Sequence, residues 1–229
     1  MRVTGQCLFA AFLALVTLAG CGGGGGRPAS QASYFPLAEA NKWSYHLTVY
    51  VDQSSASKRA LPSPGLFRLV PAGVLAKMAP AQSVDLVSTV LGSAIIEGES
   101  YWALESEMLE TGETGIQNMR SDHTGIYRYE QLGEQGGDVP VLKLPPTVGD
   151  TWTMLGDENI TYTTEATNES VTVPAGSFRC VRVRQVDSTV SPAYTIVTWF
   201  AYGVGLVQDN TLEGDTLTSE IGLVSYELH

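Results

Sequence analysis

The sequence predicts a mainly β fold: an antiparallel curved sheet, half-barrel or sandwich built of hairpins, with at most one or two short helices. Two observations support this prediction. Short segments in which apolar and polar residues alternate recur along the chain from about residue 42. Glycine-containing turn sequences separate them, such as those at residues 97–100 and 213–215. Strands at short intervals joined by such turns are typical of hairpins and meanders.

The alternation is clearest at the start of this region, where the apolar residues Trp43, Tyr45, Leu47, Val49 and Val51 alternate with the polar residues Lys42, Ser44, His46 and Thr48. This spacing predicts a strand with one buried and one solvated face. The same pattern predicts further strands at residues 85–91, 101–109, 115–120, 125–132, 139–144, 160–167, 169–173, 177–186, 194–202, 205–210 and 216–228. Only residues 72–84 have helical spacing, and Pro80 interrupts them. Residues 54–82 are expected either to lie across the opening of a curved sheet or to form an exposed loop.

The first 20 residues have the pattern of a signal peptide. Arg2 supplies a positive charge, and the apolar run at residues 7–18 is shorter than the roughly 20 residues that span a bilayer as a helix. Residues 18–21, Leu-Ala-Gly-Cys, resemble the bacterial lipobox. This resemblance implies cleavage between Gly20 and Cys21 and attachment of lipid, including palmitate, to Cys21.

A lipidated Cys21 predicts a membrane-anchored lipoprotein of the cell envelope, because two or more acyl chains hold a protein stably in a bilayer. By resemblance to the sorting rule of enteric-type bacteria, Gly22 in place of Asp favours the outer membrane if the organism is Gram-negative. The domain would then lie in the periplasm or at another extracytoplasmic surface. Residues 21–33 comprise this cysteine and a glycine-rich stretch with the composition of a flexible tether.

The remaining residues, 34–229, are predicted to form a single β-rich domain, or two related halves at 34–143 and 144–229. The second alternative depends on a short internal similarity. Four positions recur with the same spacing 109 residues later: Pro36/Pro145, Asn41/Asp150, Trp43/Trp152 and Ser44/Thr153. They indicate either a duplicated half-domain or one type of turn that is used twice.

Composition and charge exclude several classes. With 44% hydrophobic and 16% charged residues, the chain is neither collagen-like, disulfide-dense nor intrinsically disordered. It has 13 Lys+Arg against 24 Asp+Glu, a net charge of −11, and no basic cluster. Nucleic acid is therefore not expected as a partner.

Four segments carry a resemblance to a known group: 34–45 (Tyr-Phe-Pro-Leu to Asn-Lys-Trp-Ser-Tyr), 144–152, 172–181 (with Val-Pro-Ala-Gly-Ser-Phe) and 198–207 (Thr-Trp-Phe-Ala-Tyr-Gly-Val-Gly-Leu-Val). In this order they resemble segments of uncharacterised bacterial lipobox lipoproteins and secreted β-rich proteins. The resemblance implies an exported β-rich domain and no particular reaction. More distantly, the lipobox and acidic β domain are similar to the Lol-type lipoprotein carriers, half-barrels that hold acyl chains in an apolar concavity. That similarity is an analogy of fold, and no residue is carried over from it.

No catalytic or metal-binding constellation is predicted, and no cofactor. Ser121, Asp122 and His123 are the residue types of a catalytic triad, but adjacent residues in a turn do not converge. His46 is expected on the polar face of a strand, and His229 is the last residue. Cys180 is the only cysteine beyond Cys21 and is expected to be a small buried hydrophobe. Activation of its thiol would require a basic partner such as His46.

The acidic pairs are predicted to be a solvated outer face rather than paired catalytic carboxylates. They are Glu97/Glu99, Glu105/Glu107 and Glu110/Glu113. The densest basic site, Arg179, Arg182 and Arg184, is expected to form surface ion pairs rather than an anion site.

Two non-catalytic functions follow as hypotheses, ahead of an enzyme. In the first, the protein binds a hydrophobic ligand or lipid in a concave sheet, and its tryptophans line or floor the pocket: Trp43, Trp102, Trp152 and Trp199. In the second, the protein is a structural or surface-interaction lipoprotein that contacts an envelope protein partner and has no small-molecule ligand. A core filled by the protein's own side chains would favour the second.

Overall fold

The computed structural model describes residues 33–50, 82–132, 135–154 and 156–229, and every regular element in them is a β-strand. The mainly β prediction is therefore confirmed. The strands are β1 (Lys42–Val49), β2 (Ser83–Ile96), β3 (Glu99–Met108), β4 (Thr114–Ser121), β5 (Gly125–Leu132), β6 (Gln135–Lys143), β7 (Thr151–Met154), β8 (Asp157–Val173), β9 (Gly176–Asp187), β10 (Tyr194–Ala201), β11 (Gly205–Glu213) and β12 (Thr216–Glu227). The predicted signal peptide, Cys21 and nearly all of the tether lie outside the described residues.

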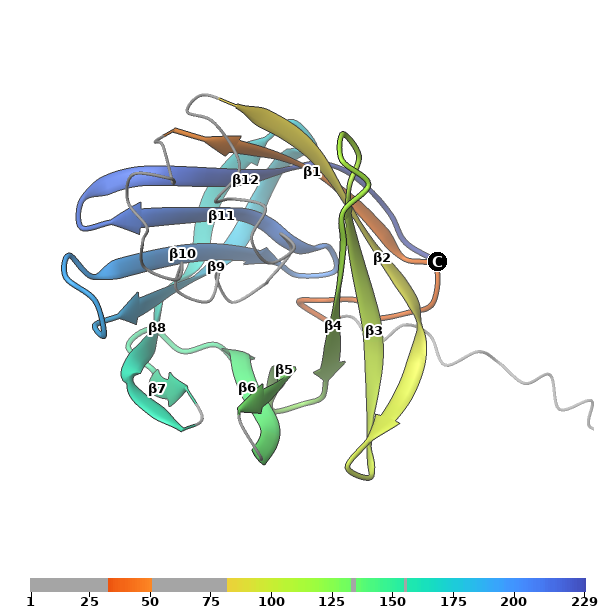
Figure 1. Cartoon of the computed structure of the whole chain (residues 1–229), viewed down its shortest axis with the longest axis horizontal. Coiled ribbons are helices and arrows are strands. Elements are labelled where there is room, and N and C mark those ends of the chain that lie inside the picture. Colours follow the sequence, from red (N-terminus) through yellow and green to blue (C-terminus); the bar gives the residue numbers. More distant parts are fainter. Residues whose placement is uncertain (1–32, 51–81, 133–134, 155) are drawn as a thin grey trace, which may run out of the picture.

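All twelve strands form one antiparallel sheet in the order β6-β5-β4-β3-β2-β1-β12-β11-β10-β9-β8-β7. Each strand thus pairs with its neighbour along the chain, except that β1 pairs with β12 and that β6 and β7 do not pair. The sheet curves round until it is nearly closed (Figure 1). It is an incomplete barrel whose two free edges, β6 and β7, follow one another in the chain.

The register shows which side chains face the interior, because residues paired across neighbouring strands share a face of the sheet. Leu47 in β1 lies opposite Val84 in β2 and Ile221 in β12, and all three are buried. Polar residues of β1 on the opposite face, such as His46, are exposed. The largest fully buried side chains are Trp43, Tyr45, Tyr162, Phe35, Phe200, Leu47, Leu86, Leu104, Met108 and Met119.

The segment before β1 packs against the start of that strand. The ring of Phe35 stacks on Trp43, with centroids 4.9 Å apart and planes 13° apart. Trp43 Nε1 donates a hydrogen bond to the carbonyl oxygen of Val204, at 2.6 Å. Asn41 is fully buried, donates to Pro36 O at 2.7 Å and accepts from the backbone N–H of His229 at 2.8 Å. These contacts join both ends of the described chain to the turn between β10 and β11.

The hairpin of β8 and β9 forms a second layer. It extends beyond the end of β10 and reaches β12, where Ala175 N donates to Leu223 O at 3.0 Å and the rings of Phe178 and Tyr226 lie 6.3 Å apart. Figure 1 shows this hairpin behind β10, β11 and β12. The second layer helps to explain why seven of the eight residues of β10, on both faces, are buried.

The two halves of the chain repeat one turn, as the internal similarity suggested. Asn41 N donates to Ala38 O and Asp150 N to Thr147 O, each at 3.1 Å. The residue before each has a positive φ, 69° at Ala40 and 92° at Gly149.

Each turn is also bound in the same way to the following strand. Ala40 N and Asn41 O bond the backbone of Val90 in β2, and Gly149 N and Asp150 O bond the backbone of Thr164 in β8. Directly after Val90 and after Thr164 the register shifts against the next strand. Val90 and Thr164 are therefore equivalent positions relative to the two turns. Whether the halves arose by duplication stays a prediction.

Three predicted elements differ from the structure. The short strand β7 was not predicted. β8 is one strand where two were predicted, at 160–167 and 169–173, because β-bulges between Thr164 and Glu169 disturb the alternation without ending the strand. Residues 83 and 84, predicted as the end of a helix, belong to β2, and residues 72–81 lie outside the described residues.

Gly205→Ala tests the packing before β1. A Cβ at this position would lie 2.8 Å from the Phe35 ring, at a φ of 112° that side chains rarely adopt. We expect a loss of about 2 kcal/mol in the free energy of unfolding, measured by urea denaturation, from strain and overpacking together. Gly92→Ala, where no atom lies within 4 Å, is the control and should change stability by less than about 0.5 kcal/mol. Equal effects of the two substitutions would contradict the packing described.

Candidate functional site

The two free edges of the sheet meet at a seam, defined as the boundary between β6 and β7, which is not bridged by a backbone ladder. Side chains bridge it instead. Trp152 Nε1 in β7 donates to Pro140 O in β6 at 2.8 Å. Lys143 Nζ lies 5.4 Å from the centroid of the Trp152 ring and 3.5 Å from Thr151 O. Pro140 has no N–H to offer a partner strand, which is typical of an edge.

Trp152 is held in place from its own side of the seam. Its ring stacks on Tyr162, its partner in β8, with centroids 5.6 Å apart and planes 10° apart. Only 8% of the residue is exposed. The indole therefore closes part of the seam with one hydrogen bond, where a complete barrel would have a row of them.

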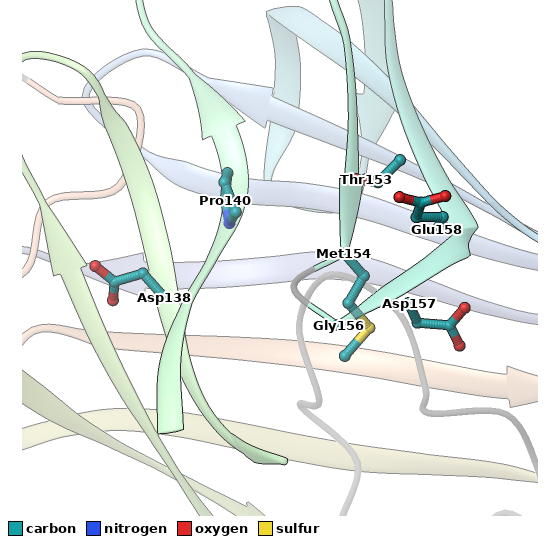
Figure 2. A pocket seen from close by; sticks show the side chains of 7 residues that line it. All are labelled: Asp138, Pro140, Thr153, Met154, Gly156, Asp157 and Glu158. Atoms are coloured by element: carbon teal, nitrogen blue, oxygen red, sulfur yellow. The ribbon is translucent and has the colours of Figure 1, made fainter. Parts of the chain in front are cut away.

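A cleft of about 640 Å³ lies at this seam. It is lined by Asp138 and Pro140 of β6, by Thr153 and Met154 of β7, by Gly156 of the following turn, and by Asp157 and Glu158 of β8. Its volume is within the range of small-molecule sites. Figure 2 shows Met154 at the end of β7, near Gly156 and Asp157, with the carboxylates of Asp138 and Asp157 pointing in opposite directions. The lining has three carboxylates and no basic residue.

The carboxylate of Asp138 belongs to a polar cluster on the outer face. It accepts hydrogen bonds from Arg120 Nε at 2.7 Å and from the hydroxyl of Tyr101 at 2.8 Å. Burial and then the hydrogen bond to Asp138 raise the pKa of Tyr101 to about 12. Burial opposes ionisation of the neighbouring Asp122, but hydrogen bonds from Thr124 and Arg120 lower its pKa to about 2. Asp138 is therefore a partner of Arg120 rather than a free ligand in the cleft.

A second titratable group lies on the inner face. Asp209 in β11 is opposite Ile221 and Thr198, and its carboxylate accepts a hydrogen bond from Thr198 Oγ1 at 2.7 Å. Burial raises the pKa of Asp209 to about 7, although the bond from Thr198 acts in the other direction. Near neutral pH this carboxyl is thus partly protonated.

The structure does not bring the four predicted tryptophans to one surface. Trp43 is fully buried, and Trp152 is at the seam. Trp102 is half-buried on the inner face, where it is paired with the buried Met119. Trp199 is paired with Arg182 and therefore lies on the outer face, 9% exposed. None of them lines the cleft; a role for any of them in ligand binding stays a prediction.

The other candidates are far apart in the sheet. His46 Nδ1 lies 2.8 Å from Asp85 on exposed strand faces. Cys180 is in β9, which β10, β11 and β12 separate from β1, and burial raises the pKa of its thiol to about 12. His123 is exposed in the turn between β4 and β5. Within the described residues no three His, Cys, Asp or Glu side chains are grouped so that they could hold a metal ion.

Two of the three arginines of β9, Arg182 and Arg184, form ion pairs with the neighbouring strand, as expected, whereas Arg179 Nη1 donates to the backbone carbonyl of Asn168 at 3.4 Å. Arg182 Nε lies 2.8 Å from Glu165 and its Nη1 lies 3.0 Å from Glu169. Arg184 Nε lies 2.5 Å from the other oxygen of Glu165. These partly exposed pairs join β8 to β9 across its bulges.

Comparison with known proteins gives one family match. Residues 157–223, which run from the start of β8 into β12, are similar to the family described as DUF3108-like. No curated protein matches the chain. The matched residues include all of β8–β11, but not the seam-forming strands β6 and β7.

Two solved structures are also similar. One is a Bacteroides fragilis protein described as exported, with a YmcC-like fold: 14% identity, TM-score 0.49, covering 86% of this chain and 100% of that one. The other is a Parabacteroides distasonis protein described as a lipoprotein: 12% identity, TM-score 0.46, covering 86% of this chain and 99% of that one. Within the described residues no helix is long and apolar enough to cross a membrane.

Trp152→Phe tests the closure of the seam. The substitution keeps an aromatic ring against Tyr162 but removes the donor to Pro140, so we expect a loss of about 1 kcal/mol beyond the effect of ring size. Amide hydrogen exchange in β6 should become faster. Trp199→Phe is the control, because Trp199 Nε1 has no hydrogen-bond partner in the described chain. Unchanged exchange in β6 would contradict the role given to Trp152.

Asp209→Asn tests the buried carboxyl. Because the pKa is higher in the folded protein than the value near 3.9 of an unfolded chain, ionisation favours unfolding, and stability falls as pH rises from about 4 to 7. The difference in the free energy of unfolding between the variant and the wild type should therefore shift by about 2 kcal/mol in favour of the variant from pH 5 to pH 8. The exposed Asp215→Asn controls for the loss of one charge. Parallel pH profiles of wild type and Asp209→Asn would show that Asp209 is not perturbed.

Proposed function

We propose that the protein is a membrane-anchored extracytoplasmic lipoprotein with a non-catalytic role, which binds a hydrophobic ligand or lipid on the concave face of its sheet. Cys21 carries the lipid anchor, and in a Gram-negative organism the outer membrane is its location. The observation that supports ligand binding is the seam. A sheet that has the strands for closure ends in two unpaired edges with a 640 Å³ cleft between them, beside an inner face rich in apolar side chains.

The seam is more informative than the apolar inner face alone. Every folded sheet buries an apolar face, but a closed sheet offers no lateral access to it. In this protein the strand on one side contributes Pro140, which cannot donate to a ladder, and the other contributes Met154, which reaches toward the interior. Both residues add apolar groups to a part of the seam that has no backbone ladder, where a flexible hydrophobic molecule could pass between the edges.

A structural or surface-interaction lipoprotein without a small-molecule ligand is the second candidate. It is favoured by the packing of the inner face, where Tyr45, Leu47, Leu86 and Leu104 are at most 1% exposed. In this case the protein's own side chains fill the interior, and the acidic outer face contacts an envelope partner.

Native mass spectrometry separates the two candidates. Residues 22–229, which include every described residue, are expressed in a bacterial host and purified without detergent. Ligand binding predicts a co-purified lipid-sized mass, or its appearance after incubation with lipid extract. A clean protein mass that stays clean in the presence of lipid would overturn the ligand-binding proposal and leave the second candidate.

Thr153→Trp connects the result to the seam. Thr153 is exposed in the cleft, so a large side chain there narrows the access without disturbing the core. We expect at least a threefold loss of bound lipid. Thr216→Trp, on an exposed residue of β12 outside the cleft, should bind as the wild type does. Equal lipid content in all three proteins would show that ligand does not pass through the cleft.

A further inference from the structure

Gln117, a polar residue on the inner face, is buried without a partner among the described residues. Gln117 in β4 is paired with Leu104 of β3, is 6% exposed and lies two residues before Met119, which is fully buried. Its neighbour Ile116, on the other face, is 61% exposed. Gln117 therefore points into the interior. Both atoms of its amide, Nε2 and Oε1, are buried and lack a hydrogen-bond partner in the described part of the chain.

Such a group is expensive to bury, because an amide that loses its hydrogen bonds to water and gains none destabilises the fold. Most buried side chains of this kind have a protein partner. A buried amide with neither its donor nor its acceptor used is therefore suited to a group that comes from outside the protein.

The other half of the chain shows what the usual partner would be. Val90 and Thr164 are equivalent positions. The residues that lie two strands further along the sheet, followed from each by cross-strand pairing, are therefore also equivalent. The first path leads through Leu104 to Gln117, and the second through Val183 to Thr198. Thr198 is bonded to Asp209 on the next strand, β11.

Gln117 lacks the corresponding partner because the next strand has moved away. β4 and β5 pair only from Met119↔Arg128 to Ser121↔Ile126, and before Met119 the two strands diverge. We call this divergence the fork. Figure 1 shows β5 and β6 turned away from β4. The unpartnered amide thus lies where the sheet opens.

The side chains beside Gln117 on β3 are apolar, whereas Arg128 of β5, opposite Met119, is buried and its Nε lies 2.5 Å from Glu130. Trp102 and Leu104 lie on the same face of the neighbouring strand, directly opposite Met119 and Gln117 respectively. Trp102 is half-buried, so part of this inner surface is accessible. An aromatic ring and a thioether beside a single amide are suited to a hydrocarbon chain that ends in one hydrogen-bonding group.

We propose that Gln117 binds the polar group of the hydrophobic ligand at the fork, with Trp102 and Met119 against its chain, and that this polar group is uncharged and both donates and accepts hydrogen bonds. A primary amide, a protonated carboxylic acid or a hydroxyl meets this description. An uncharged group is selected because Gln117 has no net charge to offset a buried ion, and the nearby charge of Arg128 is already offset by Glu130. The desolvation of an ion costs far more than that of a neutral group. The proposal rests on the proposed function.

The test uses three probes of equal chain length: dodecanamide, 1-dodecanol and dodecane. Their affinities for residues 22–229 are measured by displacement of the uncharged fluorophore N-phenyl-1-naphthylamine. The amide can satisfy both atoms of Gln117, so the wild type should bind dodecanamide about tenfold or more tighter than dodecane, with 1-dodecanol between them. Gln117→Leu should remove this preference and leave the affinity for dodecane unchanged.

Two further variants make the result specific. Gln117→Met is unbranched and closer in shape to glutamine. It should also lose the preference for dodecanamide, which would show that the loss comes from removal of the amide and not from packing around the branched leucine. Thr164→Val removes a different inner-face group without a partner in the described chain, the hydroxyl Oγ1 in β8, and should keep the preference for dodecanamide.

The outcomes separate the two proposals. If the wild type binds none of the probes, the proposed function falls. If it binds all three and the Gln117 variants keep the preference for dodecanamide, ligand binding stands and the role of Gln117 is wrong. If only Thr164→Val lost the preference for dodecanamide over dodecane, the role proposed for Gln117 would also be wrong.

Discussion

The pairing of β1 with β12 is the interaction on which the rest of the structure depends. It joins residues 42–49 to residues 219–227, and without it the chain would form two separate six-stranded meanders. Every other pairing is between neighbours in the chain. This one long-range strand pairing therefore joins the two meanders into a single sheet whose ends are β6 and β7. Closing so long a loop costs entropy, and the packing of Phe35, Trp43 and Val204 next to this junction helps to offset it.

A wide, curved sheet of this kind must also deal with polar groups on its inner face. Where neighbouring strands stay paired, several of these groups find partners across the sheet, as Thr198 does with Asp209 and Ser88 with Ser106 at 2.9 Å, although Thr164 Oγ1 has none in the described chain. Where the strands diverge, as β4 and β5 do, a partner is lost, and the Gln117 amide has none among the described residues. The unpartnered amide of Gln117 is thus a consequence of the divergence between β4 and β5.

Much of the fold could be predicted from alternation, because most strands of this sheet have one buried and one exposed face, as in β1. The prediction was weakest where tertiary context changes this pattern. β7 has only four residues, too few to show a period, and β8 is bulged. Trp199 was grouped with inward-facing tryptophans because a large aromatic residue is expected to face the core; the second layer formed by β8 and β9 buries outer-face residues as well. Gln117 gave no signal, since the loss of its partner depends on the path of β5.

The two repeated turns precede strands in different surroundings: one leads into β1, which pairs with β12, and the other leads into β7, at the seam. Trp43 and Trp152 follow the same turn, each is the second residue of its strand, and each indole N–H reaches a carbonyl oxygen. Trp43 is covered by Phe35, whose counterpart in the second half is Leu144, a residue with no ring to stack.

Trp152 stacks instead on Tyr162 of the neighbouring strand β8, and its indole N–H donates to Pro140 O of β6, on the other side of the seam. The start of β1 is therefore packed on both sides of Trp43 and continues into the β1–β12 ladder. The start of β7 instead lies at an edge that is joined to β6 by side chains and not by a backbone ladder. A difference of one aromatic residue and one pairing thus accompanies the change from a closed contact to a cleft.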